Sequence, residues 1–412
     1  MLGRSLEWRV YTFSVLDDLI LFYPIYAVLF SETGLSGGEI SSLFAIWSVV
    51  AFTAELPSGA WADVMPRPML LAAGQIARAI AFGLWTIAPS YPAFAVGFVL
   101  WGLKSATTSG TFESLVYDGL AAEGRAEFYV RLRGRAESLA VSGNIAATAL
   151  AGVAFAAGGY VLVGIASSIV CVAVALVALG WPEPRRRMPA DLDKSARYWA
   201  VLRAGLSEAI AHRALRNMIV LSAVAQGITA FDEYLPLLAT AGGVATGIVP
   251  LVVLPSLLAM VAGGLAAGWL PAVSGRVVSV LLLVATLLHM LGAASSTAAG
   301  AVVAGLVLGV LQFARIQVDA WLQHAIVGPA RATVTSLASL CAELVAIGVY
   351  ATWALGSTAL PTPLLYASLG VLVLAFALFA ALWGPRSRRD LEPGASALVG
   401  PGSDKTDGPG PA

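Results

Sequence analysis

The sequence predicts an all-α membrane protein, and three observations carry this prediction. First, 58% of the 412 residues are hydrophobic and only 12% are charged, with a mean hydropathy of +0.83, whereas charged residues make up about 25% of soluble proteins. Second, apolar stretches of the ~20 residues needed to cross a bilayer recur about twelve times. Third, one turn motif returns in the second half of the chain, which indicates an internal duplication.

The apolar stretches divide the chain into two halves with six predicted spans each. In the first half the spans are residues 9–31, 38–61, 69–89, 92–118, 136–157 and 159–181, and in the second they are 215–240, 244–270, 277–296, 298–325, 333–356 and 361–383. We therefore expect an N-terminal bundle over 1–181, a cytoplasmic linker with an amphipathic helix over 182–214, a C-terminal bundle over 215–384 and a disordered cytoplasmic tail over 385–412.

Basic residues predict the orientation of the chain in the membrane. Clusters such as Arg185–Arg187 and Arg386–Arg389 fall in alternate connections or at the termini, while the connections between them, such as Ser31–Gly37, contain neither Lys nor Arg. By the positive-inside rule, both termini are cytoplasmic. Arginine outnumbers lysine, and alanine, glycine and valine abound, as is typical of a GC-rich bacterial genome. We therefore expect a multi-pass protein of a bacterial inner membrane.

The recurring turn motif lies between the second and third predicted spans. Its first copy contains Gly59, Asp63 and Arg67, and its second copy ends in Gly275 and Arg276 without the acid. This pattern resembles the G-x-x-x-D-x-x-G-R loop between helices 2 and 3 of the major facilitator superfamily of secondary transporters. The resemblance implies the fold of that family, with 12 transmembrane helices in two six-helix bundles related by an axis along the membrane normal.

Two further stretches resemble the same family. Ser109–Asp118, followed by Arg135, looks like the exit from helix 4, and Arg331 begins a stretch similar to its counterpart after helix 10. The resemblance covers residues 9 to about 383. It implies a cytoplasmic gate motif that consists of Gly59, Asp63, Arg67, Glu113, Asp118, Arg135, Gly275, Arg276 and Arg331.

Charged residues inside the predicted spans mark a candidate cavity. An ionisable side chain near the bilayer centre costs a few kcal/mol, so each one is a functional candidate. In the family that the chain resembles, helices 1, 4, 7 and 10 line the central cavity. On these helices the candidates for proton coupling and for the cavity are Asp17, Asp18, Lys104, Asp232, Glu233, Arg315 and Asp319. Glu55 on helix 2 and Arg78 on helix 3 are expected at the same depth in the membrane. We interpret them as a gate or structural pair.

Depth along each helix predicts which of these charges meet. At ~1.5 Å per residue, Lys104 comes level with the Asp232-Glu233 pair, and Arg315 comes level with the Asp17-Asp18 pair. We therefore expect two ion pairs that cross from one bundle to the other. In the alternative interpretation, Lys104 and Arg315 neutralise acids for folding only.

The adjacent carboxylates Asp17 and Asp18 are the first candidates for coupling to protons. On a helix they point about 100° apart, and both cannot be cheaply ionised in a low-dielectric site. Such a carboxyl takes up a proton outside and releases it inside. The alternative is that one of them only caps the helix or pairs with Arg315. With Glu113 of helix 4 included, the cavity helices carry six acids (Asp17, Asp18, Glu113, Asp232, Glu233 and Asp319) and two bases (Lys104 and Arg315), which predicts a cationic or zwitterionic substrate.

Together these features predict a secondary active transporter, and not an enzyme, that works on protons and a small molecule. We expect a monomer in the lipid bilayer, with no cofactor, metal or nucleic acid. Gly158 and Gly159 match the glycines that end the family's antiporter signature, which favours export. The apolar, arginine-poor cavity indicates an amphipathic small molecule, so we expect efflux of an amphipathic, cationic drug or secondary metabolite. Proton-coupled uptake of a small nutrient stays open as an alternative, as does a membrane sensor or scaffold that no longer transports.

Overall fold

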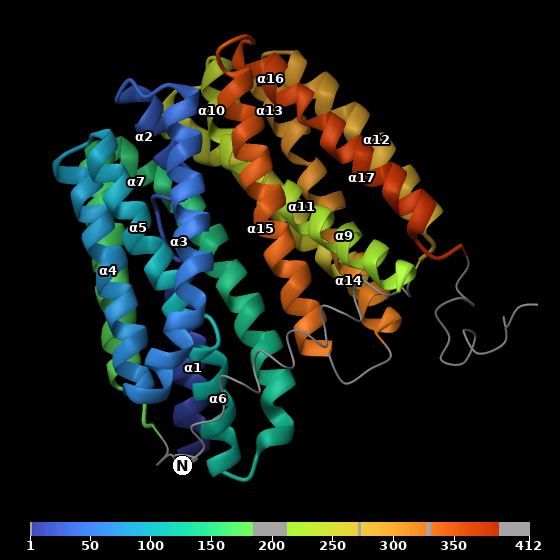
Figure 1. Cartoon of the computed structure of the whole chain (residues 1–412). Coiled ribbons are helices and arrows are strands. Elements are labelled where there is room, and N and C mark those ends of the chain that lie inside the picture. Colours follow the sequence, from blue (N-terminus) through green and yellow to red (C-terminus); the bar gives the residue numbers. More distant parts are fainter. Residues whose placement is uncertain (1, 184–211, 271–272, 327–330, 387–412) are drawn as a thin grey trace, which may run out of the picture.

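A computed structural model describes residues 2–183, 212–270, 273–326 and 331–386. This part of the chain is helical and contains no strand. In Figure 1 the helices form two bundles side by side, one from the N-terminal half (blue to green) and one from the C-terminal half (yellow-green to red). The predicted all-α membrane fold is therefore confirmed, whereas most of the predicted linker helix and the predicted tail lie outside the described residues.

The N-terminal bundle contains seven α-helices and one 3-10 turn. They are α1 (Leu2–Asp18), α2 (Tyr26–Glu32), α3 (Gly37–Val64), α4 (Arg67–Ile87), α5 (Tyr91–Thr108), α6 (Thr111–Ala122), η1 (Ala126–Phe128) and α7 (Tyr129–Leu179). The described part of the C-terminal bundle consists of α9 (Arg213–Gly227), η2 (Ile228–Tyr234), α10 (Leu235–Ala241), η3 (Thr246–Ile248), α11 (Val249–Trp269), α12 (Gly275–Ala294), α13 (Ala298–Gly305), α14 (Val307–Ala325), α15 (Arg331–Gly356), α16 (Thr362–Ser368) and α17 (Gly370–Trp383).

Nine helices in the described residues are long and apolar enough to cross a membrane. Most of them coincide with one predicted span, and one, Ala126–Leu179, is long enough to contain two. The two predicted spans that are missing from this set, 9–31 and 92–118, are interrupted in the structure by turns. The predicted count of twelve spans is compatible with this arrangement.

The helix α7 contains two predicted spans because the chain turns back inside it. Gly158 and Gly159 leave helical geometry, and Gly159 has a φ of +59°, which glycine adopts without the steric cost that a Cβ would bring. Across this turn the rings of Phe155 and Tyr160 pack edge to face, with centroids 4.9 Å apart. The fifth and sixth predicted spans are thus two helices joined by a tight turn.

The first predicted span is broken near its middle, so the expectation of one continuous helix over 9–31 is wrong. α1 ends at Asp18 and α2 begins at Tyr26. Pro24 lies in the break, and a proline supplies no N–H to a helix and clashes with the turn before it. The N–H of Phe22 donates instead to Ser167 Oγ, at 3.2 Å. The fourth span is likewise interrupted, at Gly110, whose φ is +69°.

The seventh predicted span has a matching break. α9 ends at Gly227, the chain continues as the 3-10 turn η2, and α10 begins at Leu235. Pro236 lies in the first turn of α10, where the missing N–H of proline is tolerated. Asp232 and Glu233 therefore lie on a tight turn instead of on a regular helix.

The two bundles meet at one face of the molecule. In Figure 1 their upper ends touch, whereas the lower parts of α7 and α15 stand apart on the side that holds the N-terminus. A Cβ built on Gly37 would lie 2.5 Å from Ser357 Cβ of the other bundle, and a Cβ built on Gly152 would lie 2.6 Å from the Gly247 carbonyl oxygen. We call the joined side the closed face and the opposite side the N-terminal face.

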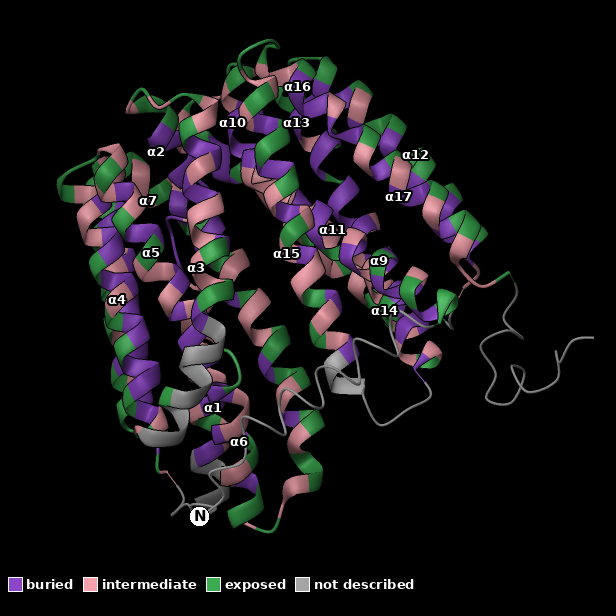
Figure 2. Cartoon of the chain, in the orientation of Figure 1, coloured by how far each residue is buried: buried purple, intermediate pink, exposed green. Residues whose placement is uncertain are grey.

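The outward surfaces of the bundles are apolar. Figure 2 shows exposed residues in stripes along the outer helices, including α12 and α17. On α12 these stripes contain large hydrophobic side chains such as Leu281, Val284 and Leu288, which are 41%, 56% and 50% exposed. Such extended apolar surface is tolerated where lipid, and not water, surrounds the protein.

Candidate functional site

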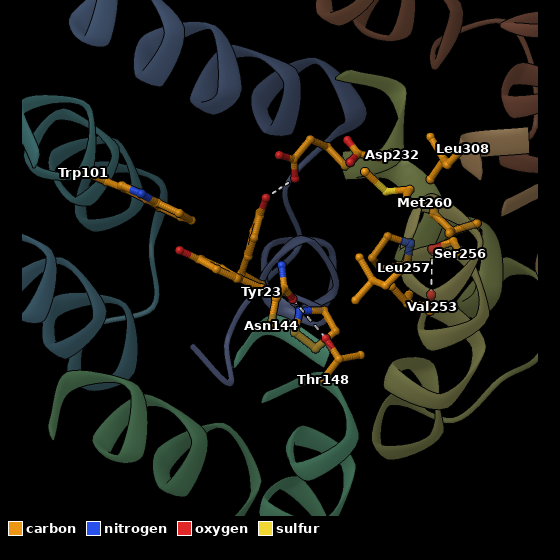
Figure 3. Close-up of a pocket in the computed structure, with 15 residues that line it drawn as sticks. Tyr23, Trp101, Asn144, Thr148, Asp232, Val253, Ser256, Leu257, Met260 and Leu308 are labelled. Carbon is orange, nitrogen blue, oxygen red and sulfur yellow. Dashed lines mark hydrogen bonds between the residues drawn. The ribbon is translucent and has the colours of Figure 1, made fainter. Parts of the chain in front are cut away.

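A cavity of about 220 Å³ lies between the two bundles, beside the breaks in the first and seventh spans. Residues of both halves line it. Figure 3 shows Trp101 and Tyr23 on one side and Leu257 and Met260 on the other, with Asp232 near the upper rim. The breaks explain the position of the cavity. Where a helix is interrupted by a turn, its backbone does not continue along the helix axis, and space is left between the bundles.

One wall of the cavity is aromatic. The rings of Tyr23 and Trp101 are stacked, with centroids 5.4 Å apart and an angle of 8° between their planes. Tyr26 meets Trp101 edge to face at 5.9 Å. Aromatic faces attract cations through the ring quadrupole, and the attraction grows when water is excluded. This wall suits an amphipathic molecule with a positive charge.

The acids Asp232 and Glu233 also line the cavity. The Tyr26 hydroxyl donates a hydrogen bond to Glu233 Oε2. Among the salt bridges of the described residues, none involves Asp232 or Glu233. Two carboxyl groups therefore line the cavity without a described cation to balance them.

A second charged cluster lies inside the N-terminal bundle, around Asp17. One carboxylate oxygen of Asp17 accepts bonds from Arg78 Nη2 and Gln75 Nε2, both at 2.7 Å, and the other oxygen accepts from Lys104 Nζ at 2.9 Å. The side chain of Arg78 is fully buried, and that of Lys104 is 10% exposed. Arg78 Nη1 also donates to the Tyr23 hydroxyl at 3.0 Å, so this cluster supports the aromatic wall.

The predicted ion pairs across the bundles are not the pairs that the structure contains. Lys104 lies against Asp17 of its own bundle and not against the Asp232-Glu233 pair, and Arg78 likewise binds Asp17. The depth estimate placed the start of the first span at residue 9, whereas α1 begins at Leu2. Asp17 is therefore ~22 Å along its helix instead of 12–15 Å, and this difference brings it level with Lys104.

The remaining candidates for the cavity lie elsewhere in the structure. Asp17 and Asp18 are not among the described lining residues, and Asp18 is partly exposed. Arg315 Nε donates to Gln312 on the same helix at 3.2 Å, so the predicted pairing of Arg315 with the Asp17-Asp18 pair is also replaced by a local bond. Asp319 is exposed on α14. Of the seven predicted cavity residues, Asp232 and Glu233 are the two that line the cavity.

The gate motif residues that the structure describes lie near the N-terminal face. Arg67 binds Asp118 at 2.5 Å and Arg133 binds Glu113 at 3.2 Å, and both pairs stay within the N-terminal bundle. Gly275 packs against α17, where a Cβ would lie 2.2 Å from the Ala380 carbonyl oxygen. Arg135 and Arg276 are exposed. The side chains of Glu55, Asp63 and Arg331 and the surroundings of Gly59 lie outside the described residues.

Sequence reasoning left out several residues of the site. The sequence predicts Arg78 beside Glu55, and it gives Tyr23, Tyr26 and Trp101 no direct mark as residues of the cavity. A signal for Arg78 was present, because an arginine in an apolar span needs a buried acid. A signal for Tyr23 was the proline that follows it, since a proline inside a span marks a probable break.

Comparison with known proteins supports the assignment of the fold. The family model of the Major Facilitator Superfamily matches residues 10–348. A D-xylose–proton symporter has a TM-score of 0.69, with 12% sequence identity over 94% of this chain and 99% of that chain. The nucleoside transporter NupG has a TM-score of 0.64, with 13% identity over 93% and 97% of the two chains.

A third similar structure is a bacterial homologue of the human lysosomal transporter Spinster, in an inward-facing and unoccupied conformation. Its TM-score is 0.66, with 16% identity over 93% of this chain and 95% of that chain. Identities this low show a common fold alone. A search of curated proteins finds no match. Because the family model covers most of the sequence, the chain belongs to the major facilitator superfamily of secondary transporters.

Proposed function

We propose that the protein exports a small amphipathic organic cation in exchange for protons. One observation carries this proposal, namely the cavity that combines Asp232 and Glu233, which form no described salt bridge, with the aromatic wall of Tyr23, Tyr26 and Trp101. Carboxylates without a partner are costly in a low-dielectric site. A positively charged substrate lowers that cost by supplying the missing counter-charge.

The cluster around Asp17 strengthens the argument about charge. Asp17 is balanced within the N-terminal bundle by Arg78 and Lys104. Arg78 and Lys104 are therefore already engaged by Asp17, and the negative charge that lines the cavity comes from η2. This arrangement favours a cation over an anion of the same size.

The closed face supports a mechanism of alternating access. If both termini are cytoplasmic, as the positive-inside rule predicts, the separated ends of α7 and α15 face the cytoplasm and the structure is inward-open. Substrate would then enter the cavity from the cytoplasm. Rocking of the bundles would open the closed face and release the substrate outside.

We assign the coupling proton to Asp18. Asp17 is engaged by three donors, whereas Asp18 forms no salt bridge in the described part of the chain and is partly exposed. A carboxyl without a fixed cation exchanges its proton with water more readily than one that is held in a salt bridge. The predicted Asp17-Asp18 pair is thereby divided into a structural acid and a proton-exchanging acid.

The test is transport by purified protein in proteoliposomes with an imposed pH gradient. We expect wild-type protein to move a lipophilic cation, and Asp232→Asn and Glu233→Gln each to slow this transport at least ~10-fold, because each removes a charge-assisted contact. Glu127→Gln, which neutralises an exposed acid in η1, is the matched control. Transport of lipophilic anions alone, or wild-type rates in both cavity variants, would show that the proposal is wrong.

A further inference from the structure

Two consecutive residues of η2 bind the opposite bundle. Glu233 Oε2 accepts a hydrogen bond from the Tyr26 hydroxyl, and the Tyr234 hydroxyl lies 2.8 Å from Ser41 Oγ. The ring of Tyr234 stacks on Trp353 with centroids 3.9 Å apart. One short turn thus carries both an acid of the cavity and a tyrosine that packs at the closed face.

The Tyr26 side chain is held firmly in its position. It is buried, with an exposed fraction of 4%, and its ring packs against Trp101 and against Phe98, at 5.9 Å and 6.2 Å. The hydroxyl is therefore a fixed donor that ties the N-terminal bundle to Glu233. Any molecule that takes this carboxylate as its counter-ion has to share it with Tyr26 or displace Tyr26.

We infer that the Tyr26–Glu233 hydrogen bond is a latch that is released by a protonated amine and not by a quaternary ammonium ion. This inference rests on the proposed function, because it deepens the description of the same cation site. It names the class of substrate, which is an amphipathic primary, secondary or tertiary amine that carries an N–H donor.

The reason lies in what each cation offers to the carboxylate. A protonated amine brings to the carboxylate both an N–H donor and a full positive charge, which the neutral Tyr26 hydroxyl lacks, and it therefore replaces the Tyr26 hydroxyl on Glu233. A quaternary ammonium ion has no donor. It is attracted by the negative charge and by the aromatic rings, but it leaves the bond between Tyr26 and Glu233 in place.

Tyr234, the residue after Glu233, connects release of the latch to the closed face. When Glu233 turns from Tyr26 to the amine, η2 loses one of its two hydrogen bonds to the N-terminal bundle. The other, between Tyr234 and Ser41, then remains as the one described hydrogen bond from η2 to that bundle. A ligand shifts a conformational equilibrium only through its different affinity for the two states, and this exchange of donors supplies such a difference.

The experiment uses a cysteine reporter in full-length protein in lipid nanodiscs. Cys171 and Cys341 are replaced by Ala, and Ser357→Cys places a thiol where the bundles meet at Gly37. The probes are protonated N,N-dimethylphenethylamine and its N-methylated quaternary ion, which differ by one methyl group in place of the N–H. Binding affinity and the rate of maleimide labelling are measured for each probe.

We expect the amine to bind at least ~10-fold more tightly than the quaternary ion and to speed labelling several-fold, while the quaternary ion leaves labelling unchanged. Tyr26→Phe removes the latch, so it should speed labelling without ligand, bring the two affinities closer together and abolish the response to the amine. Tyr91→Phe is the matched control, because the Tyr91 hydroxyl bonds to Ser42 within the N-terminal bundle, at 2.9 Å.

Two kinds of failure are distinguishable. If Glu233→Gln binds both probes as the wild type does, or if neither probe binds the wild type, the cation site itself is wrong, and with it the proposed function. If Glu233→Gln loses binding but the quaternary ion opens the closed face as well as the amine does, the cation site stands and the latch is wrong. Wild-type behaviour of Tyr26→Phe would likewise overturn the latch.

Discussion

At the scale of single residues, the position of Asp17 explains how three charges are kept inside the N-terminal bundle. Its carboxylate binds Arg78 and Lys104 directly and is further held by Gln75. A buried ion pair adds little net stability, but the loss of one partner leaves an uncompensated charge in a low-dielectric interior. The stability of this bundle therefore depends on Asp17.

We predict that Asp17→Asn lowers the stability of the protein by ~3–5 kcal/mol, because Arg78 and Lys104 lose their common counter-charge. The measurement is the melting temperature of purified protein in detergent. Glu137→Gln, which removes an exposed pairing with Arg133, is the control and should cost at most ~1 kcal/mol. Equal melting temperatures for the two variants would contradict the central role of Asp17.

A second prediction at this scale concerns proton coupling. If Asp18 carries the proton, Asp18→Asn should still exchange substrate across the membrane but should no longer respond to an imposed pH gradient. Counterflow and gradient-driven transport in the same proteoliposomes separate the two activities. Gradient-driven transport at the wild-type rate would move the coupling site to Asp232 or Glu233.

At the scale of the helices, glycines set how closely neighbouring elements approach. α11 and α14 meet at Gly263, where a Cβ would lie 2.0 Å from the Gly309 carbonyl oxygen. The adjacent Gly264 faces a looser contact, with its nearest neighbour, Ile316 Cδ1, 3.9 Å from the Cβ position. Small residues at helix contacts are the usual means of close packing in a membrane, because lipid gives helices no hydrophobic reason to associate.

We therefore predict opposite effects for two neighbouring substitutions. Gly263→Ala should destabilise the C-terminal bundle by ~1–3 kcal/mol, because its methyl group forces α11 away from α14. Gly264→Ala should be neutral or stabilising by up to ~1 kcal/mol, because alanine is the better helix former. Melting temperatures in detergent check both, and a similar decrease in the two variants would be evidence against the tight contact.

At the scale of the whole molecule, elements of the two bundles lie against each other, with α3 beside α15 and with α7 beside α11 and η3. Glu32 takes part, because it accepts hydrogen bonds from Tyr160 of its own bundle and from Thr246 of the other, at 2.9 Å and 2.5 Å. Gly152 lies against the Gly247 carbonyl in the same region. The conformation of the transporter therefore depends on close contacts at the closed face, and a larger side chain at such a contact would disturb them.

We predict that Gly152→Val shifts the protein toward the state that is open on the closed face, because the new side chain cannot fit against the Gly247 carbonyl. Spin labels on Cys introduced at Ser31 and Thr358, which are exposed on opposite bundles, report the separation of the bundles. Their mean distance should increase. Gly134→Val on the same helix, where a Cβ meets nothing within 4 Å, should leave the distance unchanged, and an identical distribution in both variants would argue against this prediction.

The sequence by itself determined the membrane class and the family, because these depend on features that are local in the chain. The length of an apolar stretch is set by the thickness of the bilayer, and the motif around Gly59 and Arg67 repeats as a linear pattern. The candidate acids Asp232 and Glu233 could also be found this way, since an acid in an apolar span stands out against its neighbours.

Only the tertiary structure decided which charges pair and which face the cavity. The partners of Asp17 come from residues 58 to 87 positions away in the chain, and a depth estimate that assumes regular helices misplaces them when a helix begins earlier or breaks at a proline. The bond between Tyr26 and Glu233 joins residues 207 positions apart in the chain. Pairings of this kind depend on how two bundles pack together, and no spacing within one span encodes that packing.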